Sequence, residues 1–191
     1  MTAEPAPAAR PAQAPSTLGV GVIVWLASEL MFFSGLFAAY FTLRGVNEVW
    51  PPDDVELATA RTAVATVVLL ASSLTMHLAV GAAERDDRRG AIGWLGITMV
   101  LGGLFLANLV GEYAEAPFQI DSHAYGSIFY LMTGFHGLHV LGGLVLMAAI
   151  MAAIVGRSLA PVRRTVDVCS YYWHFVDVVW VAMFTSIYLI R

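Results

Sequence analysis

Lysine is absent from this 191-residue chain, and charged residues of all kinds make up only 13% of it. Soluble domains contain about 25% charged and about 45–50% apolar residues. Here 59% of the residues are hydrophobic, and the mean hydropathy is +0.73. The composition therefore predicts an integral membrane protein. The net charge of −4 says little about function, because the charges lie in short loops and do not form one continuous face.

Cysteine occurs once, as Cys169, which excludes an internal disulfide and a metal site built from cysteines. We interpret this residue as a small buried apolar side chain. The chain also lacks the Gly-x-Ser-x-Gly turn of serine hydrolases, a phosphate-binding loop and a basic patch suited to nucleic acid. Catalysis by a serine nucleophile, nucleotide binding and nucleic-acid binding are therefore not indicated.

Alternating apolar and polar residues, the pattern of a membrane β-barrel, are missing as well. Five apolar stretches instead reach the length of about twenty residues that a helix needs to cross a bilayer. We expect an all-α integral membrane protein in which residues 19–191 form a bundle of five transmembrane helices. The helices are predicted at about residues 19–43, 62–83, 91–113, 127–154 and 166–190.

Residues 1–18 are rich in Ala and Pro and show no periodicity. They do not contain the basic region, short apolar core and small-residue cleavage site that follow one another in a signal peptide. Because of their composition, we predict a disordered cytoplasmic tail. Arginine placement predicts the orientation of the bundle, because basic residues are concentrated in cytoplasmic loops. Seven of the ten arginines fall on the side of the N-terminus and three on the other side. This places the N-terminus in the cytoplasm and the C-terminus outside.

Several ionisable residues lie inside the predicted spans, although a charge at the bilayer centre costs about 2.5–3.5 kcal/mol on insertion scales. Residues three or four apart share a helical face. His136 with His139, and His174 with Asp177, are therefore each expected to point one way, into the bundle. The candidate site residues are Glu29, Glu112, His136, His139, His174 and Asp177.

Three interpretations of these residues remain open from chemistry alone. The histidines could ligate a metal or haem, but His136 and His139 on one helix cannot hold a haem from both faces. Glu29 with either of these histidines could form part of a proton path. Alternatively, each acid meets a histidine or hydroxyl on a neighbouring helix and fixes how the helices pack. Polar residues inside a bundle serve this structural purpose more often than catalysis.

Several stretches together resemble subunit III of the haem-copper respiratory oxidases, in particular cytochrome c oxidase. They span Ser28 to Trp180, and the two histidine motifs lie about thirty residues apart on successive helices. With its five predicted helices, the chain resembles the short form of this subunit found in actinobacterial members. The matching stretches are "SELMFFSGLFAAYF", "WPP", the "EY" at the end of the third helix, "FHGLHVLGG" and "YYWHFVDVVW".

The resemblance implies a non-catalytic subunit with no catalytic, cofactor-binding or metal-binding residues of its own. Haem and copper would belong to partner subunits, which reduce dioxygen to water. The chain would pack on subunit I, hold phospholipid and support proton uptake on the cytoplasmic side. The six candidate residues match intramembrane polar positions of the family, and we interpret them as structural or lipid-contacting.

Full-length family members have seven helices, so the resemblance implies that the first two are missing here. The lipid-holding cleft of the long form would then be open to bulk lipid or closed by another subunit. Implied partners are subunit I, subunit II, small accessory subunits, membrane lipids and a cytochrome bc complex in a supercomplex. Subunit III of a quinol oxidase, an accessory protein of nitric oxide reductase and an independent proton-conducting protein using Glu29 remain alternatives.

Overall fold

The computed structural model describes residues 17–190 apart from 54 and 158–161. The predicted disordered tail lies outside the described residues except for Thr17 and Leu18, which already belong to the first helix. No strand occurs among the described residues. The elements are α1 (Thr17–Val46), α2 (Thr59–Glu84), α3 (Arg88–Glu115), α4 (Ala124–Val155), α5 (Val162–Phe184) and a π-helical turn, η1 (Thr185–Leu189).

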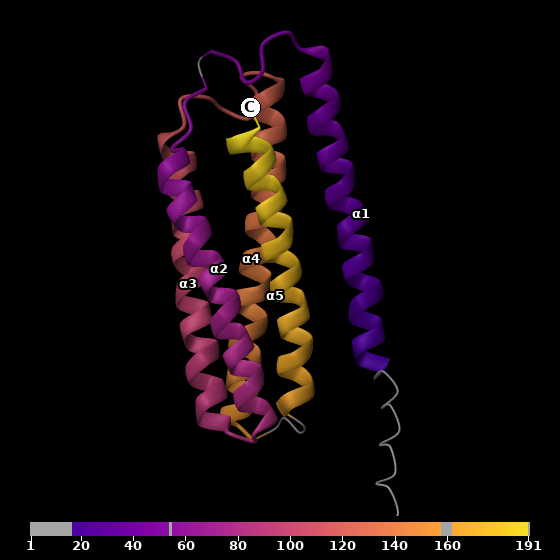
Figure 1. The fold of residues 1–191 in the computed structure, drawn as a ribbon, viewed down its shortest axis with the longest axis vertical. Coiled ribbons are helices and arrows are strands. Elements are labelled where there is room, and N and C mark those ends of the chain that lie inside the picture. The colour runs from indigo at the N-terminus through magenta and orange to yellow at the C-terminus, as the bar shows by residue number, and fades with distance from the viewer. Residues whose placement is uncertain (1–16, 54, 158–161, 191) are drawn as a thin grey trace, which may run out of the picture.

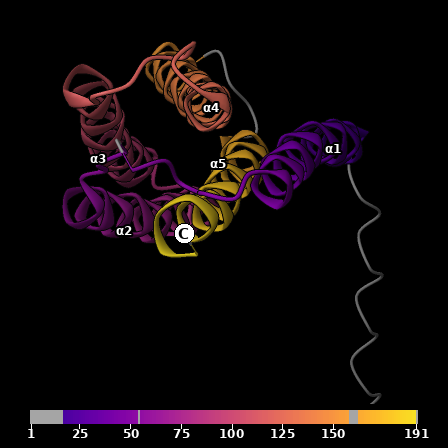
Figure 2. The same ribbon diagram turned by 90° about the horizontal axis from the view of Figure 1, so that it is seen from above.

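Each of the five helices is long and apolar enough to cross a membrane, which confirms the predicted all-α, five-helix membrane fold. Consecutive helices run in opposite directions (Figure 1). Seen from above, α2, α3, α4 and α5 form a ring, and α1 stands outside it (Figure 2). Within the ring each helix contacts the next, and α1 contacts α4 and α5.

The interior of the ring is organised around Trp173 of α5, which is fully buried. Its indole N–H donates to the hydroxyl of Ser72 on α2 at 2.9 Å. The ring system lies against Gly102 of α3 and Gly143 of α4, where an added Cβ would come within 2.6 Å and 2.8 Å of Trp173 atoms. Small residues at these positions let the backbones approach closely, which is the usual route to helix association in lipid.

Helix α1 contributes little to the interior. Of its described side chains, only Phe33 and Tyr40 are buried. The Tyr40 hydroxyl donates to the backbone carbonyl of Ser186 at 2.8 Å, which ties α1 to the end of the chain. Most of the described α1 surface is therefore available to lipid or to another protein.

Candidate functional site

Glu29 of α1 and His139 of α4 join the outer helix to the ring. Their Oε2 and Nε2 atoms lie 3.1 Å apart, and both side chains are more than three-quarters buried. His139 Nδ1 lies 2.7 Å from the Phe135 carbonyl, which can only accept, so Nδ1 donates. Either Glu29 carries a proton that it donates to Nε2, or an imidazolium faces a carboxylate. In both cases the pair is electrically neutral and holds one shared proton.

A groove of about 600 Å³ opens beside this pair, between α1, α4 and α5. Trp25 stacks on Tyr172 with ring centroids 5.4 Å apart and planes within 2°. The Tyr172 hydroxyl donates to the His139 carbonyl at 2.7 Å. The rest of the lining is largely apolar, with Leu138 and Leu146 on α4. The groove therefore offers an aliphatic surface whose tyrosine and histidine already have partners.

His174 and Asp177 of α5 meet Ser73 of α2. The Ser73 hydroxyl donates to Asp177 Oδ2 and lies 3.0 Å from His174 Nδ1. Because Ser73 has given its only proton to Asp177, it accepts from His174, which places a proton on Nδ1. Asp177 is 3% exposed, and its second oxygen, Oδ1, has no partner among the described residues. We call these three residues the α2–α5 cluster.

Glu112 lies at the end of α3 and is 3% exposed. Its Oε2 accepts from the Tyr188 hydroxyl at 2.8 Å and from Thr62 at 3.2 Å. Tyr188 comes from η1, and π-helical turns often occur at positions with a special role. Glu112 therefore joins α2, α3 and the end of the chain.

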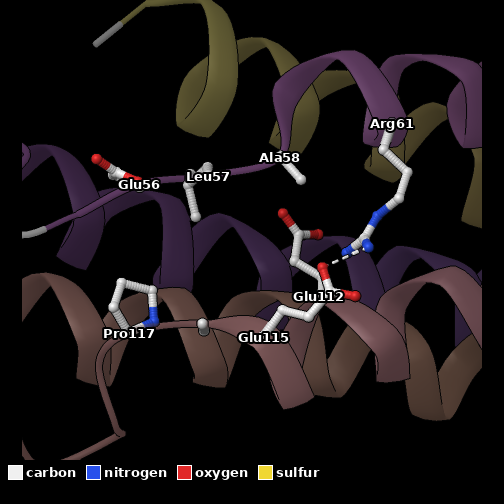
Figure 3. Close-up of a pocket in the computed structure, with 8 residues that line it drawn as sticks. Glu56, Leu57, Ala58, Arg61, Glu112, Glu115 and Pro117 are labelled. Atoms are coloured by element: carbon white, nitrogen blue, oxygen red, sulfur yellow. Dashed lines mark hydrogen bonds and ion pairs between the residues drawn. The ribbon is translucent and has the colours of Figure 1, made fainter.

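A polar pocket of about 320 Å³ borders Glu112. In Figure 3 the dashed line joins the Arg61 guanidinium to the Glu115 carboxylate, and the Glu112 carboxylate lies beside this pair. Arg61 forms an ion pair with Glu115 at 2.5 Å, while Glu112 Oε1 has no partner among the described residues. Two carboxylates thus share the neighbourhood of one arginine at this end of the bundle.

His136 is fully buried and stands apart from the other candidates. Its ring stacks on Trp180 at 4.9 Å and meets the edge of Phe105 at 5.8 Å. Neither ring nitrogen has a hydrogen-bond partner among the described residues. The expectation that His136 and His139 point the same way is wrong. They differ by about 60° around the helix, which suffices to aim one at α3 and α5 and the other at α1.

The structure thus separates the six candidates into three hydrogen-bonded groups and one aromatic site. Within the described part of the chain, no group of three or more His, Cys, Asp or Glu side chains is arranged to hold a metal ion. Thr62, Ser73 and Tyr188 were missed from the sequence. Hydroxyl residues are common in the chain, and only the three-dimensional fold shows which of them face an acid.

Comparison of the sequence with known proteins shows which family the chain resembles. The family of cytochrome c oxidase subunit III matches residues 10–190. A probable cytochrome c oxidase subunit 3 of Nocardia farcinica is 45% identical over 182 residues, covering 93% of this chain and 90% of the relative. Cytochrome c oxidase subunit 3 of Corynebacterium diphtheriae is 42% identical over 184 residues, with the same shares covered. That of Thermostichus vulcanus is 38% identical and covers 90% of this chain and 86% of the relative.

Proposed function

This chain belongs to the cytochrome c oxidase subunit III family, and we propose that it supports the catalytic subunits of its haem-copper oxidase without performing redox chemistry itself. It is a multi-pass membrane protein of an oxidase complex. The proposed role is to pack against the haem-bearing subunit I, to hold phospholipid and to sustain proton uptake during dioxygen reduction.

One observation carries the structural role. Each of the three candidate acids hydrogen-bonds to a side chain on another element: Glu29 to His139, Asp177 to Ser73, and Glu112 to Tyr188. Interhelical bonds of this kind contribute about 0.6–2 kcal/mol each. The acids are thus engaged in joining helices.

Lipid holding is supported by the groove beside Trp25 and Tyr172. Its lining is mostly apolar, and the His139 and Tyr172 side chains bond within the protein. Such a surface suits an acyl chain, which needs shape complementarity and offers no hydrogen bonds. We propose that a phospholipid acyl chain lies there.

The proposed orientation has the N-terminus in the cytoplasm, following the arginine distribution. At the predicted cytoplasmic end, Arg163 pairs with Glu84 at 2.9 Å across α5 and α2. Support of proton uptake from this side rests on the family resemblance, as do contacts with subunit II, small accessory subunits and a cytochrome bc complex. Reporter fusions after residues 86 and 120 would test the orientation, and the first should lie in the cytoplasm.

Affinity purification of the tagged chain from its native membranes tests the proposed function. We expect it to bring down a haem-bearing membrane subunit, and we expect the separated chain to show no haem absorbance. A bis-histidine haem spectrum from the separated chain would contradict the proposal.

Reconstitution of the chain alone in liposomes addresses the proton-conducting alternative. Glu29 is held in a closed pair with His139, so we expect no proton flux. Flux that disappears in Glu29→Gln would favour an independent proton-conducting function over the proposed one.

A further inference from the structure

The polar pocket between the ends of α2 and α3 is lined by two side chains with buried polar atoms that form no hydrogen bond. Glu112 is 3% exposed, and its Oε1 has no partner among the described residues. Nε and Nη2 of Arg61, which lines the same pocket, are also buried without a described partner. Buried groups of this kind are costly to leave unbonded. The pocket thus contains one unused acceptor and two unused donors of opposite charge.

Arg61 and Glu112 are complementary, yet Arg61 bonds to a different acid. Its Nη1 lies 2.5 Å from Oε2 of Glu115, and the two side chains of this pair are 38% and 65% exposed. Both carboxylates lie beside the guanidinium in Figure 3. Glu112 Oε2 accepts only from the neutral hydroxyls of Tyr188 and Thr62 among the described residues. One arginine therefore neutralises the more exposed acid and leaves the buried one without a cation.

The other ionisable groups around Glu112 do not supply a positive charge. Glu56 and Glu115 are acids, and the tyrosines are neutral at ordinary pH. Among these groups Arg61 alone can compensate a negative charge on Glu112. The ionisable side chains that line the pocket, contact Glu112 or lie in its neighbourhood are Glu56 of the loop before α2, Arg61 of α2, Tyr113 and Glu115 of α3, Tyr130 of α4 and Tyr188 of η1.

The charge on Glu112 decides which pairing is stable. A buried carboxylate without a cation beside it is strongly disfavoured, whereas the neutral acid is not. The arrangement with Arg61 on Glu115 therefore suits a Glu112 that carries a proton. An ionised Glu112 instead requires Arg61, whose guanidinium fork can present Nε and Nη2 together to a carboxylate.

We propose that Glu112 is a proton-exchange site and that Arg61 moves from Glu115 to Glu112 when the proton leaves. The O–H bond of the acid breaks, and the proton passes to water in the pocket, whose volume of about 320 Å³ has room for several molecules. With Glu112 neutral, Arg61 neutralises Glu115. With Glu112 ionised, Glu115 becomes a free negative charge at the surface. A buried acid thus controls the charge of an exposed one, independently of the proposed support of catalysis.

Infrared difference spectroscopy of the purified oxidase complex tests the proposal, with spectra compared across the pH range in which buried carboxyl groups titrate. As the pH rises, we expect one carboxylic acid band to be replaced by carboxylate bands, together with a change in an arginine guanidinium band. Both contributions should be missing in Glu112→Gln, whose amide resembles the neutral acid. The guanidinium change should remain in Glu48→Gln, an exposed acid on the loop after α1. Spectra of Glu112→Gln that coincide with those of the parent would overturn the proposal.

Substitutions of the two partners provide a second measurement with opposite expected signs. In Arg61→Gln the ionised Glu112 has no cation to meet, so its acid band should persist to a pH higher by about one unit or more. In Glu115→Gln, Arg61 is free to stay on Glu112, and the acid band should disappear at a lower pH than in the parent. Arg89→Gln, an exposed arginine at the start of α3, should titrate as the parent does. Shifts of the same sign in the two partner variants, or no shift in either, would overturn the exchange of Arg61 between the acids.

Discussion

The Trp173 indole occupies the space that a side chain on Gly102 would need. A Cβ added at Gly102 would lie 2.6 Å from the tip of the Trp173 ring, closer than real Cβ contacts come. Trp173 is fully buried and bonded to Ser72, so it has little freedom to move aside. The contact between α3 and α5 therefore depends on glycine at this position.

Gly102→Ala is expected to destabilise the protein by about 1–3 kcal/mol, the usual cost of overpacking a well-packed interior. The thermal unfolding temperature of the purified oxidase complex should fall. Gly103→Ala is the matched control, because a Cβ there meets no described atom within 4 Å. Alanine also favours a helix interior over glycine by about 0.5–1 kcal/mol. Equal unfolding temperatures for the two variants would contradict the proposed packing.

His136 provides a test of an unsatisfied polar group. Its nitrogens have no partner among the described residues, and it lies between Phe105 and Trp180. His136→Leu removes the polar atoms at similar volume, so we expect stability within about 1 kcal/mol of the parent. His136→Ala opens a cavity and should cost about 2–4 kcal/mol. A large loss in His136→Leu, measured by thermal unfolding of the complex, would indicate a hydrogen-bonded role for the imidazole.

The five spans could be predicted because a helix crossing a bilayer requires a long apolar run, and the chain has five. The helix ends differ from the predicted ones. α3 begins at Arg88, because Asp87 caps it by accepting from the Gly90 amide at 2.9 Å. Hydropathy marks where a chain enters the lipid, whereas capping decides where the helix begins.

The partners of the buried acids could not be predicted. Ser73 and Tyr188 have no sequence feature that separates them from other hydroxyl residues. Tyr188, which bonds to Glu112, lies in the π-helical turn, and no sequence pattern predicts that turn. The three-residue spacing of His136 and His139 was misleading. Helical periodicity gives relative direction, but the neighbours of α4 determine what each direction meets.

Tyr188→Phe tests the bond to Glu112. The substitution removes the donor at 2.8 Å and leaves Glu112 Oε2 with Thr62 at 3.2 Å. A buried acceptor that loses a partner costs about 1–3 kcal/mol, so the complex should unfold at lower temperature. Tyr171→Phe is the control, because Tyr171 is 51% exposed. Combining Tyr188→Phe with Glu112→Gln should give less than the sum of the two single effects. Additive effects would show that the two side chains do not interact.

Glu29 tests whether its hydrogen bond to His139 helps to hold α1 against the other helices. In Glu29→Gln the amide can still donate to His139 Nε2, because Nδ1 carries the imidazole proton. In Glu29→Leu no donor remains. We expect Glu29→Gln to keep the unfolding temperature of the complex, and Glu29→Leu to lose about 0.6–2 kcal/mol, the range of interhelical hydrogen bonds. Equal losses would mean that charge is required. No loss in either variant would mean that Phe33 and Tyr40, the buried α1 side chains, hold the helix without help from the pair.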